Sequence, residues 1–333
     1  MNNLQTTLQA ARSGAALYDS SNWGKILVGD RDRLRFLHNQ STADFEKRQA
    51  GDVCDTVFVT STARTIDLVT GLILDDQVLL ITSPNRREYL FHWLDKYIFF
   101  ADRVTLKDIT PSLASFTLMG AESATILARW GCPDLTEIAH NSHKLYHIDG
   151  IDVRISIGTE LGLPGYRLIV VGGASPEENR SQSIALQQSL ANLGAVKLGE
   201  DAWECIRISQ GRPKPDAELT EDYNPLEVGL WQTISFSKGC YIGQETIARL
   251  NTYKGVKQYL WGVKLAEFVT VGTGITVDGE KVGVLTSCSE IDGQILGLGY
   301  VRSKAGGVSL KVMLGDVKGE IISLPFVRHE YPI

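Results

Sequence analysis

The last 79 residues, from Gly255 to the C-terminus, contain thirteen of the chain's 32 glycines. Short runs of Val, Ile and Leu alternate with these glycines, and the pairs Asp278-Gly279 and Asp292-Gly293 stand between strand-like flanks. An Asp-Gly pair between two apolar runs favours the tight turn of a β-hairpin, because both central turn residues need positive φ. The pattern predicts a small antiparallel β-barrel or jelly roll over residues 255–333, with a domain boundary near residue 255.

Residues 1–254 mix two kinds of pattern. Apolar runs predict strands at 24–29 and at 65–82, where Asp75-Asp76 would form a turn between two strands. Helical patterns cover 86–99, 121–131, 175–193 and 201–211. With 43% hydrophobic residues in 333, the chain can bury more than one core. We therefore predict an α+β region over 1–254, built of two interleaved subdomains, followed by the barrel.

Two of these segments carry further detail. Ser175 as cap, Pro176 at the first helical position and Glu177 and Glu178 in the first turn predict the start of a long helix. Residues 212–230 are rich in proline and acidic residues and predict an irregular connector. Long structured loops of this kind tend to carry function.

Charge and composition exclude several classes of protein. A net charge of −6 and a pI near 5.6 argue against stable binding to nucleic acid. No apolar run approaches the roughly 20 residues of a membrane span, and the N-terminus lacks the order of a secretory signal. We expect a protein of the cytoplasm, or of an organellar stroma or matrix after removal of a transit peptide.

Neither cysteines nor histidines predict a metal site. The five cysteines are scattered, odd in number and without a Cys-x-x-Cys pair, which fits a reducing compartment. The histidines at 140, 143 and 147 would lie along one side of a helix, but their segment is polar and runs into a strand. We therefore expect no metal ligands here.

One cysteine stands in a distinctive place. The stretch "SFSKGCYIGQETIARL" puts Cys240 two residues after Lys238 and just before a predicted helix. Nearby positive charge and a helix N-terminus both favour the thiolate. Gly239 and Gly243 allow positive φ or a close approach of the backbone. The sequence thus allows an exposed, activated sulfur on a turn between a strand and a helix.

An ordinary structural role is the alternative. Free cysteine is among the most buried residue types, so Cys240 could instead be a small buried hydrophobic residue. Lys238 could equally be a solvated lysine. The order of residues in the chain assigns no partner base to this thiol.

The motif "KGCYIGQE" (238–245) resembles the Lys-Gly-Cys-Tyr/Phe-x-Gly-Gln-Glu motif of YgfZ-type folate-binding proteins, relatives of the glycine-cleavage T protein, an aminomethyltransferase. All seven specified positions match. The phrases "AELTED" and "NPLEVGL" upstream, "GEKVGVLTS" in the last domain and "WGKILVGDRDRLRFLHNQSTAD" near the start extend the resemblance over most of the chain.

The resemblance implies a fold and a function. The fold would be a GcvT/YgfZ-like ring of two α+β N-terminal domains and a C-terminal antiparallel β-barrel around an opening that holds a reduced folate. The function would be support of the maturation or repair of iron–sulfur proteins, with tetrahydrofolate or a one-carbon derivative as cofactor and iron–sulfur client or assembly proteins as partners. Cys240 and Lys238 would carry that activity.

Further site residues follow from the same resemblance. Asp67 lies near the position of the aspartate that the aminomethyltransferase uses against its folate, although it could also face solvent on a hairpin. A pterin needs stacking faces and its glutamyl tail a cation, which Trp231 and Tyr241, near Phe236, and Arg64 or Arg249 could supply. Gln244 belongs to the motif itself. Core packing is the alternative for each aromatic residue.

The sequence departs from the motifs of the family at two places, and these departures help to rank the possible functions. Thr62-Ala63-Arg64 stands where the family often has Lys-Gly-Arg, and Gly165-Tyr166-Arg167 stands where the aminomethyltransferase has Gly-Tyr-Glu. A guanidinium has no acceptor lone pair, so Arg167 cannot accept a hydrogen bond from a pterin N–H. We rank a folate-dependent accessory factor for iron–sulfur proteins first. The alternatives are an aminomethyltransferase-like one-carbon transferase and a non-enzymatic folate-binding scaffold, so the sequence does not settle whether the protein is an enzyme.

Overall fold

The computed structural model describes residues 3–135, 139–171, 173 and 175–331. The chain forms two compact units, and neither is a single stretch of sequence. The first comprises Met1–His38, Asp44–Thr56 and Val69–Trp203, and the second comprises Asn39–Ala43, Val57–Leu68 and Glu204–Ile333. None of the described helices is long and apolar enough to cross a membrane.

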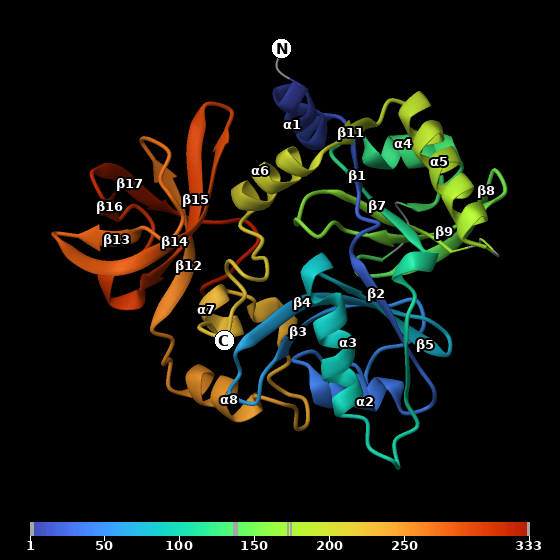
Figure 1. Ribbon diagram of the computed structural model, residues 1–333, viewed down its shortest axis with the longest axis horizontal. Helices are drawn as coiled ribbons and strands as arrows, with labels where there is room; N and C mark the ends of the chain where they lie inside the picture. The colour runs from blue at the N-terminus through green and yellow to red at the C-terminus, as the bar shows by residue number, and fades with distance from the viewer. Residues whose placement is uncertain (1–2, 136–138, 172, 174, 332–333) are drawn as a thin grey trace. The chain divides into compact units, whose positions relative to one another are not determined.

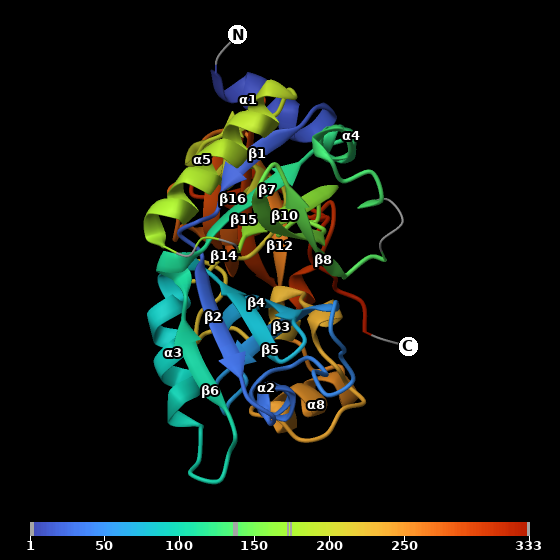
Figure 2. The same ribbon diagram turned by 90° about the vertical axis from the view of Figure 1, so that its right-hand side faces the viewer.

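The first unit contains a six-stranded sheet with strand order β11-β1-β7-β10-β9-β8. β11 pairs with β1 in parallel, and the other neighbours are antiparallel. The strands are β1 (Ala16–Asp19), β7 (Ala114–Met119), β8 (His143–Ile148), β9 (Ile151–Ile157), β10 (Gly165–Val170) and β11 (Val196–Leu198). The helices beside it are α1 (Asn3–Ser13), α4 (Ser123–Trp130) and α5 (Pro176–Asn192). Figure 2 shows α5 running along one face of this sheet.

Helix α5 begins where the sequence predicts. The Ser175 hydroxyl accepts a hydrogen bond from the backbone N–H of Glu178 at 3.2 Å, which satisfies one of the unpaired donors of the first turn. Leu186 and Leu190 on this helix are buried in the core that the sheet forms with α4 and α5. A capped start and an apolar stripe together fix both the beginning and the orientation of the helix.

A second sheet has the order β3-β4-β5-β2-β6. Its strands are β2 (Gly24–Gly29), β3 (Val53–Val59), β4 (Thr65–Ile73), β5 (Gln77–Thr82) and β6 (Thr105–Asp108). Helices α2 (Arg33–Gln40) and α3 (Arg87–Lys96) accompany it, and Figure 1 shows α3 beside β2. β3 and β4 continue into the second unit, which contains their residues 57–59 and 65–68.

The second unit contains the predicted barrel, which is closed and antiparallel in the order β12-β15-β14-β13-β16-β17. The strands are β12 (Gln258–Leu265), β13 (Gly274–Val277), β14 (Glu280–Ile291), β15 (Gln294–Arg302), β16 (Lys311–Leu314) and β17 (Val317–Ile322). Both Asp-Gly pairs form hairpin turns with positive φ at each residue, 50° and 85° at 278–279 and 52° and 74° at 292–293. The predicted α+β fold with a C-terminal barrel is confirmed.

The connector, residues 212–230 after helix α6 (Glu200–Gln210), is more ordered than the sequence predicts. It contains one helical turn, α7 (Pro225–Val228), whose start is a capping box between Asn224 and Glu227. It also contributes Glu218, whose side chain is fully buried and accepts hydrogen bonds from Thr286 and Ser287 of β14 at 2.7 Å each. The connector is therefore tied to the barrel by a buried carboxylate.

Arg207 of α6 lies at the centre of this connection. Its Nη1 is 3.1 Å from Glu218 Oε2, and its Nε and Nη2 are 2.8 and 2.7 Å from the two carboxylate oxygens of Glu204. Lys214 Nζ adds a contact of 2.8 Å to Glu204. These four side chains form a network of alternating charge within the second unit.

The network predicts that stability falls in acid. Burial raises the pKa of the Glu204 carboxyl, but the hydrogen bonds and charges of Arg207 and Lys214 outweigh burial and lower that pKa from 4.5 to about 2. A lowered folded-state pKa contributes stability above pH 4.5 that is lost as the pH falls toward 2. We expect about 2 kcal/mol from this group after allowance for its partial exposure.

Urea denaturation between pH 7 and pH 2.5 measures this contribution. Glu204→Gln should be less stable than wild type at pH 7, and the difference should shrink steadily as the pH falls from 4.5 to 2.5. Glu280→Gln, the same change at an exposed position of the barrel, is the control and should follow the wild-type curve. An unchanged pH slope in Glu204→Gln would show that this carboxylate is not the titrating group.

Candidate functional site

Cys240 is exposed, as predicted, and the bend that carries it lies before helix α8 (Gln244–Thr252). The segment that precedes it is not a strand, contrary to the prediction: a 3₁₀ turn, η4 (Trp231–Thr233), is followed by irregular backbone up to residue 241. The alternative that Cys240 is a buried hydrophobic residue is wrong. An exposed thiol just before a helix is accessible to a reagent or a partner.

Gly243 shapes the turn at the start of α8. Its φ is +83°, and a Cβ there would lie 2.9 Å from the carbonyl oxygen of Thr60 and 3.1 Å from the Cα of Ala63. The neighbouring N–H of Ile242 donates to the carbonyl of Asn39 at 3.0 Å. Only glycine combines this φ with so close an approach, so the turn packs directly on the loop between β3 and β4.

Lys238 is buried, which overturns its interpretation as a solvated lysine. Its ammonium donates to the carbonyls of Ser41 at 2.7 Å and Ala43 at 2.8 Å, and it lies 4.4 Å from the centroid of the Tyr241 ring. A buried cation on two carbonyls and a ring face ties the motif to residues 41–43. That Lys238 also tunes the thiol of Cys240 stays a prediction.

Trp231 and Tyr241 lie in one apolar cluster. Trp231 is 6% exposed, and its ring centroid lies 4.8 Å from that of Tyr331 and 6.0 Å from that of Phe236. Tyr241 packs against the same cluster, and burial raises the pKa of its hydroxyl. Both aromatic residues serve packing here, and their stacking on a pterin stays a prediction.

Gln244 and Arg249 are both on α8. The side-chain oxygen of Gln244 accepts from the backbone N–H of Tyr241 at 3.3 Å, so it closes the turn that carries Cys240. Arg249 lies on the exposed side of the helix. Neither residue lines the cavity described below.

Arg64 immediately precedes β4, and Asp67 is the third residue of that strand. Asp67 is fully buried, so its interpretation as the solvent face of a hairpin is wrong. A carboxylate in such a place needs polar partners, and this burial is compatible with the pterin role predicted for it. Arg64 is half-buried and is the one predicted site residue that lines the cavity.

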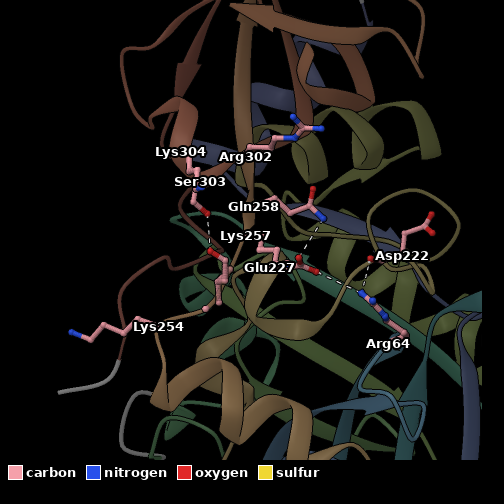
Figure 3. Close-up of a pocket in the computed structure, with 11 residues that line it drawn as sticks. Arg64, Asp222, Glu227, Lys254, Lys257, Gln258, Arg302, Ser303 and Lys304 are labelled. Carbon is pink, nitrogen blue, oxygen red and sulfur yellow. Dashed lines mark hydrogen bonds and ion pairs between the residues drawn. The ribbon is translucent and has the colours of Figure 1, made fainter. Parts of the chain in front are cut away.

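The second unit contains a cavity of about 750 Å³. Figure 3 shows Arg64 on one side of it, with its guanidinium directed at Glu227 and at the backbone of Asp222. The lining residues come from the start of β4, the connector, the segment after α8 and the end of β15: Arg64, Asp222, Glu227, Lys254, Gly255, Val256, Lys257, Gln258, Arg302, Ser303 and Lys304. Five of these eleven are basic and two are acidic.

Arg64 is fixed in place by the connector. Its Nη1 donates to the carbonyl of Asp222 at 2.8 Å and is 3.9 Å from a carboxylate oxygen of Glu227. Glu227 also accepts from the N–H of Asn224 at 3.0 Å, and burial raises the pKa of its carboxyl. Arg64 therefore faces a carboxylate of the protein itself, and its contact with the glutamyl tail of a folate stays a prediction.

Sequence reasoning missed Glu227 and the other four cations of the cavity. The signal for Glu227 was present, because Asn-Pro-Leu-Glu (224–227) has the spacing of a capping box. The cations Lys254, Lys257, Arg302 and Lys304 come from two segments far apart in sequence, and neither "YKGVK" nor "VRSK" is distinctive by itself.

Arg167, one of the two departures from the aminomethyltransferase pattern, is buried in the first unit. Its Nε lies 2.6 Å from Glu160 Oε1, and Glu160 Oε2 accepts from the Thr117 hydroxyl at 2.8 Å. Burial raises the pKa of the Glu160 carboxyl, but the Arg167 charge and the hydrogen bonds outweigh it and lower that pKa. The carboxylate beside Arg167 is thus ionised and already engaged.

Comparison with known proteins places the chain in a family. The sequence profile of the GCVT N-terminal domain matches residues 2–238, and the chain belongs to this family. A chloroplastic protein of Arabidopsis thaliana, provisionally named a transferase, is 40% identical over 98% of this chain and 74% of its own length. The aminomethyltransferase of Halothermothrix orenii is 26% identical over 96% of this chain and 90% of its own.

A solved structure shares the fold. The glycine cleavage system aminomethyltransferase T of Bartonella henselae superposes with a TM-score of 0.83, covering 98% of this chain and 90% of its own, at 19% identity. The chain therefore has an aminomethyltransferase-like fold.

Proposed function

We propose that this protein binds a reduced folate and supports the maturation or repair of iron–sulfur proteins through the thiol of Cys240. The observation that carries the proposal is the exposed Cys240 on a turn that is fixed at both ends. Lys238 fixes one end by its hydrogen bonds to residues 41 and 43, and Gly243 fixes the other by packing on the β3–β4 loop. A rigid, accessible thiol suits contact with a client, or transient binding of sulfur or iron.

The reduced folate, tetrahydrofolate or a one-carbon derivative, is the proposed cofactor. The family and the aminomethyltransferase-like fold support it. Within the second unit, a buried carboxylate at Asp67 suits the polar edge of a pterin, and Arg64 suits a glutamyl carboxylate. Trp231, Tyr241, Gln244 and Arg249 are proposed to contribute around the turn.

A folate-dependent one-carbon transfer is the second candidate, and a specific observation favours it. Relatives named aminomethyltransferase match nearly the whole chain at 24–27% identity. Arg167 argues against it, because a guanidinium paired with Glu160 presents donors where the pattern of that enzyme has an acceptor. We therefore rank it below the first proposal.

The place of action is part of the proposal. The Arabidopsis thaliana relative is chloroplastic, which supports an organellar stroma or matrix as one location, beside the cytoplasm. The proposed partners are iron–sulfur client or assembly proteins.

The test is complementation of a strain that lacks this gene, with the activity of an iron–sulfur enzyme as the measurement. Cys240→Ala is expected to reduce that activity to the level of the deletion strain, because it removes the thiol. Cys288→Ala is the matched control, since Cys288 is a partly exposed free cysteine of the barrel, and it should complement fully. Full complementation by Cys240→Ala would show that the thiol is not required and would favour a non-enzymatic folate-binding scaffold.

A second assay separates the proposed accessory factor from the one-carbon transferase. Purified protein is mixed with tetrahydrofolate and an aminomethylated carrier, and methylene-tetrahydrofolate is measured. We expect no formation above the protein-free background. Robust turnover would place the one-carbon transferase first.

A further inference from the structure

Another cavity, which we call the α5 cavity, lies within the first unit, between the last turns of α5 and the edge of the six-stranded sheet. Its volume is about 220 Å³. The residues that line it come from β1, β7, α5 and the chain from α5 into β11: Leu17, Asp19, Phe116, Gln187, Gln188, Ala191, Ala195 and Lys197. None of them is among the residues proposed to act with the folate or with Cys240.

Strand pairing places a cation and an anion beside an apolar floor. Leu17 of β1 pairs with Lys197 of β11, and Asp19, two residues further along β1, pairs with Phe116 of β7. Alternate residues of a strand and their direct cross-strand partners share one face of a sheet, so these four side chains lie on the face that α5 covers (Figure 2). Leu17 and Phe116 are buried, whereas Asp19 and Lys197 are exposed.

The two charged groups do not pair with each other. Strand geometry puts the Cα atoms of Lys197 and Asp19 about 8 Å apart, and the Lys197 ammonium makes no hydrogen bond or ion pair with another described residue. One carboxylate oxygen of Asp19 accepts from the backbone N–H of Ser21 at 2.9 Å, which orients the carboxylate and leaves its second oxygen available. The buried ammonium of Lys25 donates to the carbonyls of Ser21 and Trp23 instead. A cation and an anion held apart in this way can bind one ligand that carries both charges.

The helix side of the α5 cavity adds neutral polar groups. Gln187 and Gln188 line it, and their side chains make no hydrogen bond with another residue in the described part of the chain. A side-chain amide accepts from an ammonium through its oxygen and donates to a carboxylate through its nitrogen. An apolar floor with a few convergent polar groups is typical of a small-molecule site.

Volume and chemistry together select the ligand. An apolar cavity of about 150 Å³ accommodates benzene, and drug-sized ligands occupy roughly 300–1,000 Å³. A cavity of about 220 Å³ therefore fits a ligand of about ten non-hydrogen atoms. A simple anion would leave Asp19 facing a like charge, and a simple cation would do the same to Lys197. A free α-amino acid carries both charges on one carbon, and a branched aliphatic side chain would cover Leu17 and Phe116.

We propose that the α5 cavity binds a free aliphatic α-amino acid of the size of leucine. Lys197 would bind the carboxylate of the ligand, Asp19 its ammonium, and Leu17 and Phe116 its side chain. These residues belong to the first unit, whereas Cys240 belongs to the second, so the site is distinct from the proposed function. A ligand that binds only the folded chain stabilises it by mass action, so supply of the amino acid would raise the stability of the protein.

Titration calorimetry on the full chain compares L-leucine with three analogues that each lack one feature. N-acetylleucine has no ammonium, leucinamide has no carboxylate, and glycine has no side chain. We expect L-leucine to bind with a Kd on the order of 0.1 mM and each analogue at least about tenfold more weakly. Lys197→Gln should weaken leucine about tenfold and leave leucinamide unchanged, because leucinamide has no carboxylate for this lysine to bind. Asp19→Asn should likewise weaken leucine and leave N-acetylleucine unchanged.

The controls are Lys107→Gln and Asp76→Asn, the same charge changes at exposed positions of the first unit outside the α5 cavity, and both should keep the wild-type affinity. Far-UV circular dichroism checks that each variant is folded. Absence of a binding heat for leucine at millimolar concentration would overturn the inference. An equal loss of leucine and leucinamide affinity in Lys197→Gln would also overturn it, because the lysine would then not bind the carboxylate. Glycine as tight as leucine would overturn the choice of an aliphatic ligand, and N-acetylleucine as tight as leucine would overturn the choice of a zwitterion.

Discussion

Replacing Arg207 with methionine is expected to lower the free energy of unfolding by about 4 kcal/mol. Methionine keeps much of the length of the side chain but removes the charge and every donor. Glu218, which is fully buried, would then keep its hydrogen bonds from Thr286 and Ser287 but lose its compensating cation. An uncompensated buried charge is the largest destabilising change that a single substitution makes in this network.

A second substitution tests that explanation. In Arg207→Met/Glu218→Gln the orphaned charge is removed, so about half of the lost stability should return. Urea denaturation monitored by tryptophan fluorescence gives both values. A loss below 1 kcal/mol in Arg207→Met would show that the network contributes little. Failure of the double variant to recover would assign the loss to packing of the arginine stem instead of charge.

Gly243→Ala is expected to destabilise the protein by about 2–3 kcal/mol and to disturb the turn that carries Cys240. A non-glycine residue at positive φ costs roughly 1–2 kcal/mol. The new Cβ would also lie 2.9 Å from the Thr60 carbonyl and from Val59 Cγ2, closer than real Cβ atoms approach, so the β3–β4 loop or the helix must shift.

The barrel offers a matched control. Gly279 has φ of +85°, close to the +83° of Gly243, and a Cβ there would meet nothing within 4 Å. Gly279→Ala should therefore show only the backbone penalty, about 1 kcal/mol. The rate at which Cys240 reacts with a thiol reagent should change in Gly243→Ala and stay at the wild-type value in Gly279→Ala. Equal destabilisation by both substitutions would show that packing on the loop is unimportant.

Local sequence signals predicted the elements that local interactions determine. The Asp-Gly pairs of the barrel and the Ser175 cap of α5 each act within a few residues, and both appear where they were expected. The sequence analysis did not predict the one-turn helix α7, because four residues are too few to show apolar periodicity. Its capping box could nevertheless have been identified in the sequence.

Burial of polar groups could not be predicted in the same way. The partners of Lys238 are carbonyl oxygens of residues 41 and 43, 197 and 195 positions away, so no window around the motif contains them. Asp67 lies on a strand that is buried on both faces from Thr65 to Val69, and a short run cannot show whether both faces are covered. The cavity requires side chains from four separate segments, which only the folded chain brings together.

The interleaving of the two units constrains how the protein is made. Residues 39–43 and 57–68 emerge early from a ribosome, yet their companions in the second unit, such as Thr233 and Lys238, are translated about two hundred residues later. At 5–20 residues per second that interval is roughly 10–40 seconds. During it, the β3–β4 loop, which later supports the cysteine turn, has no surface to dock on and stays exposed until translation of the C-terminal third is under way.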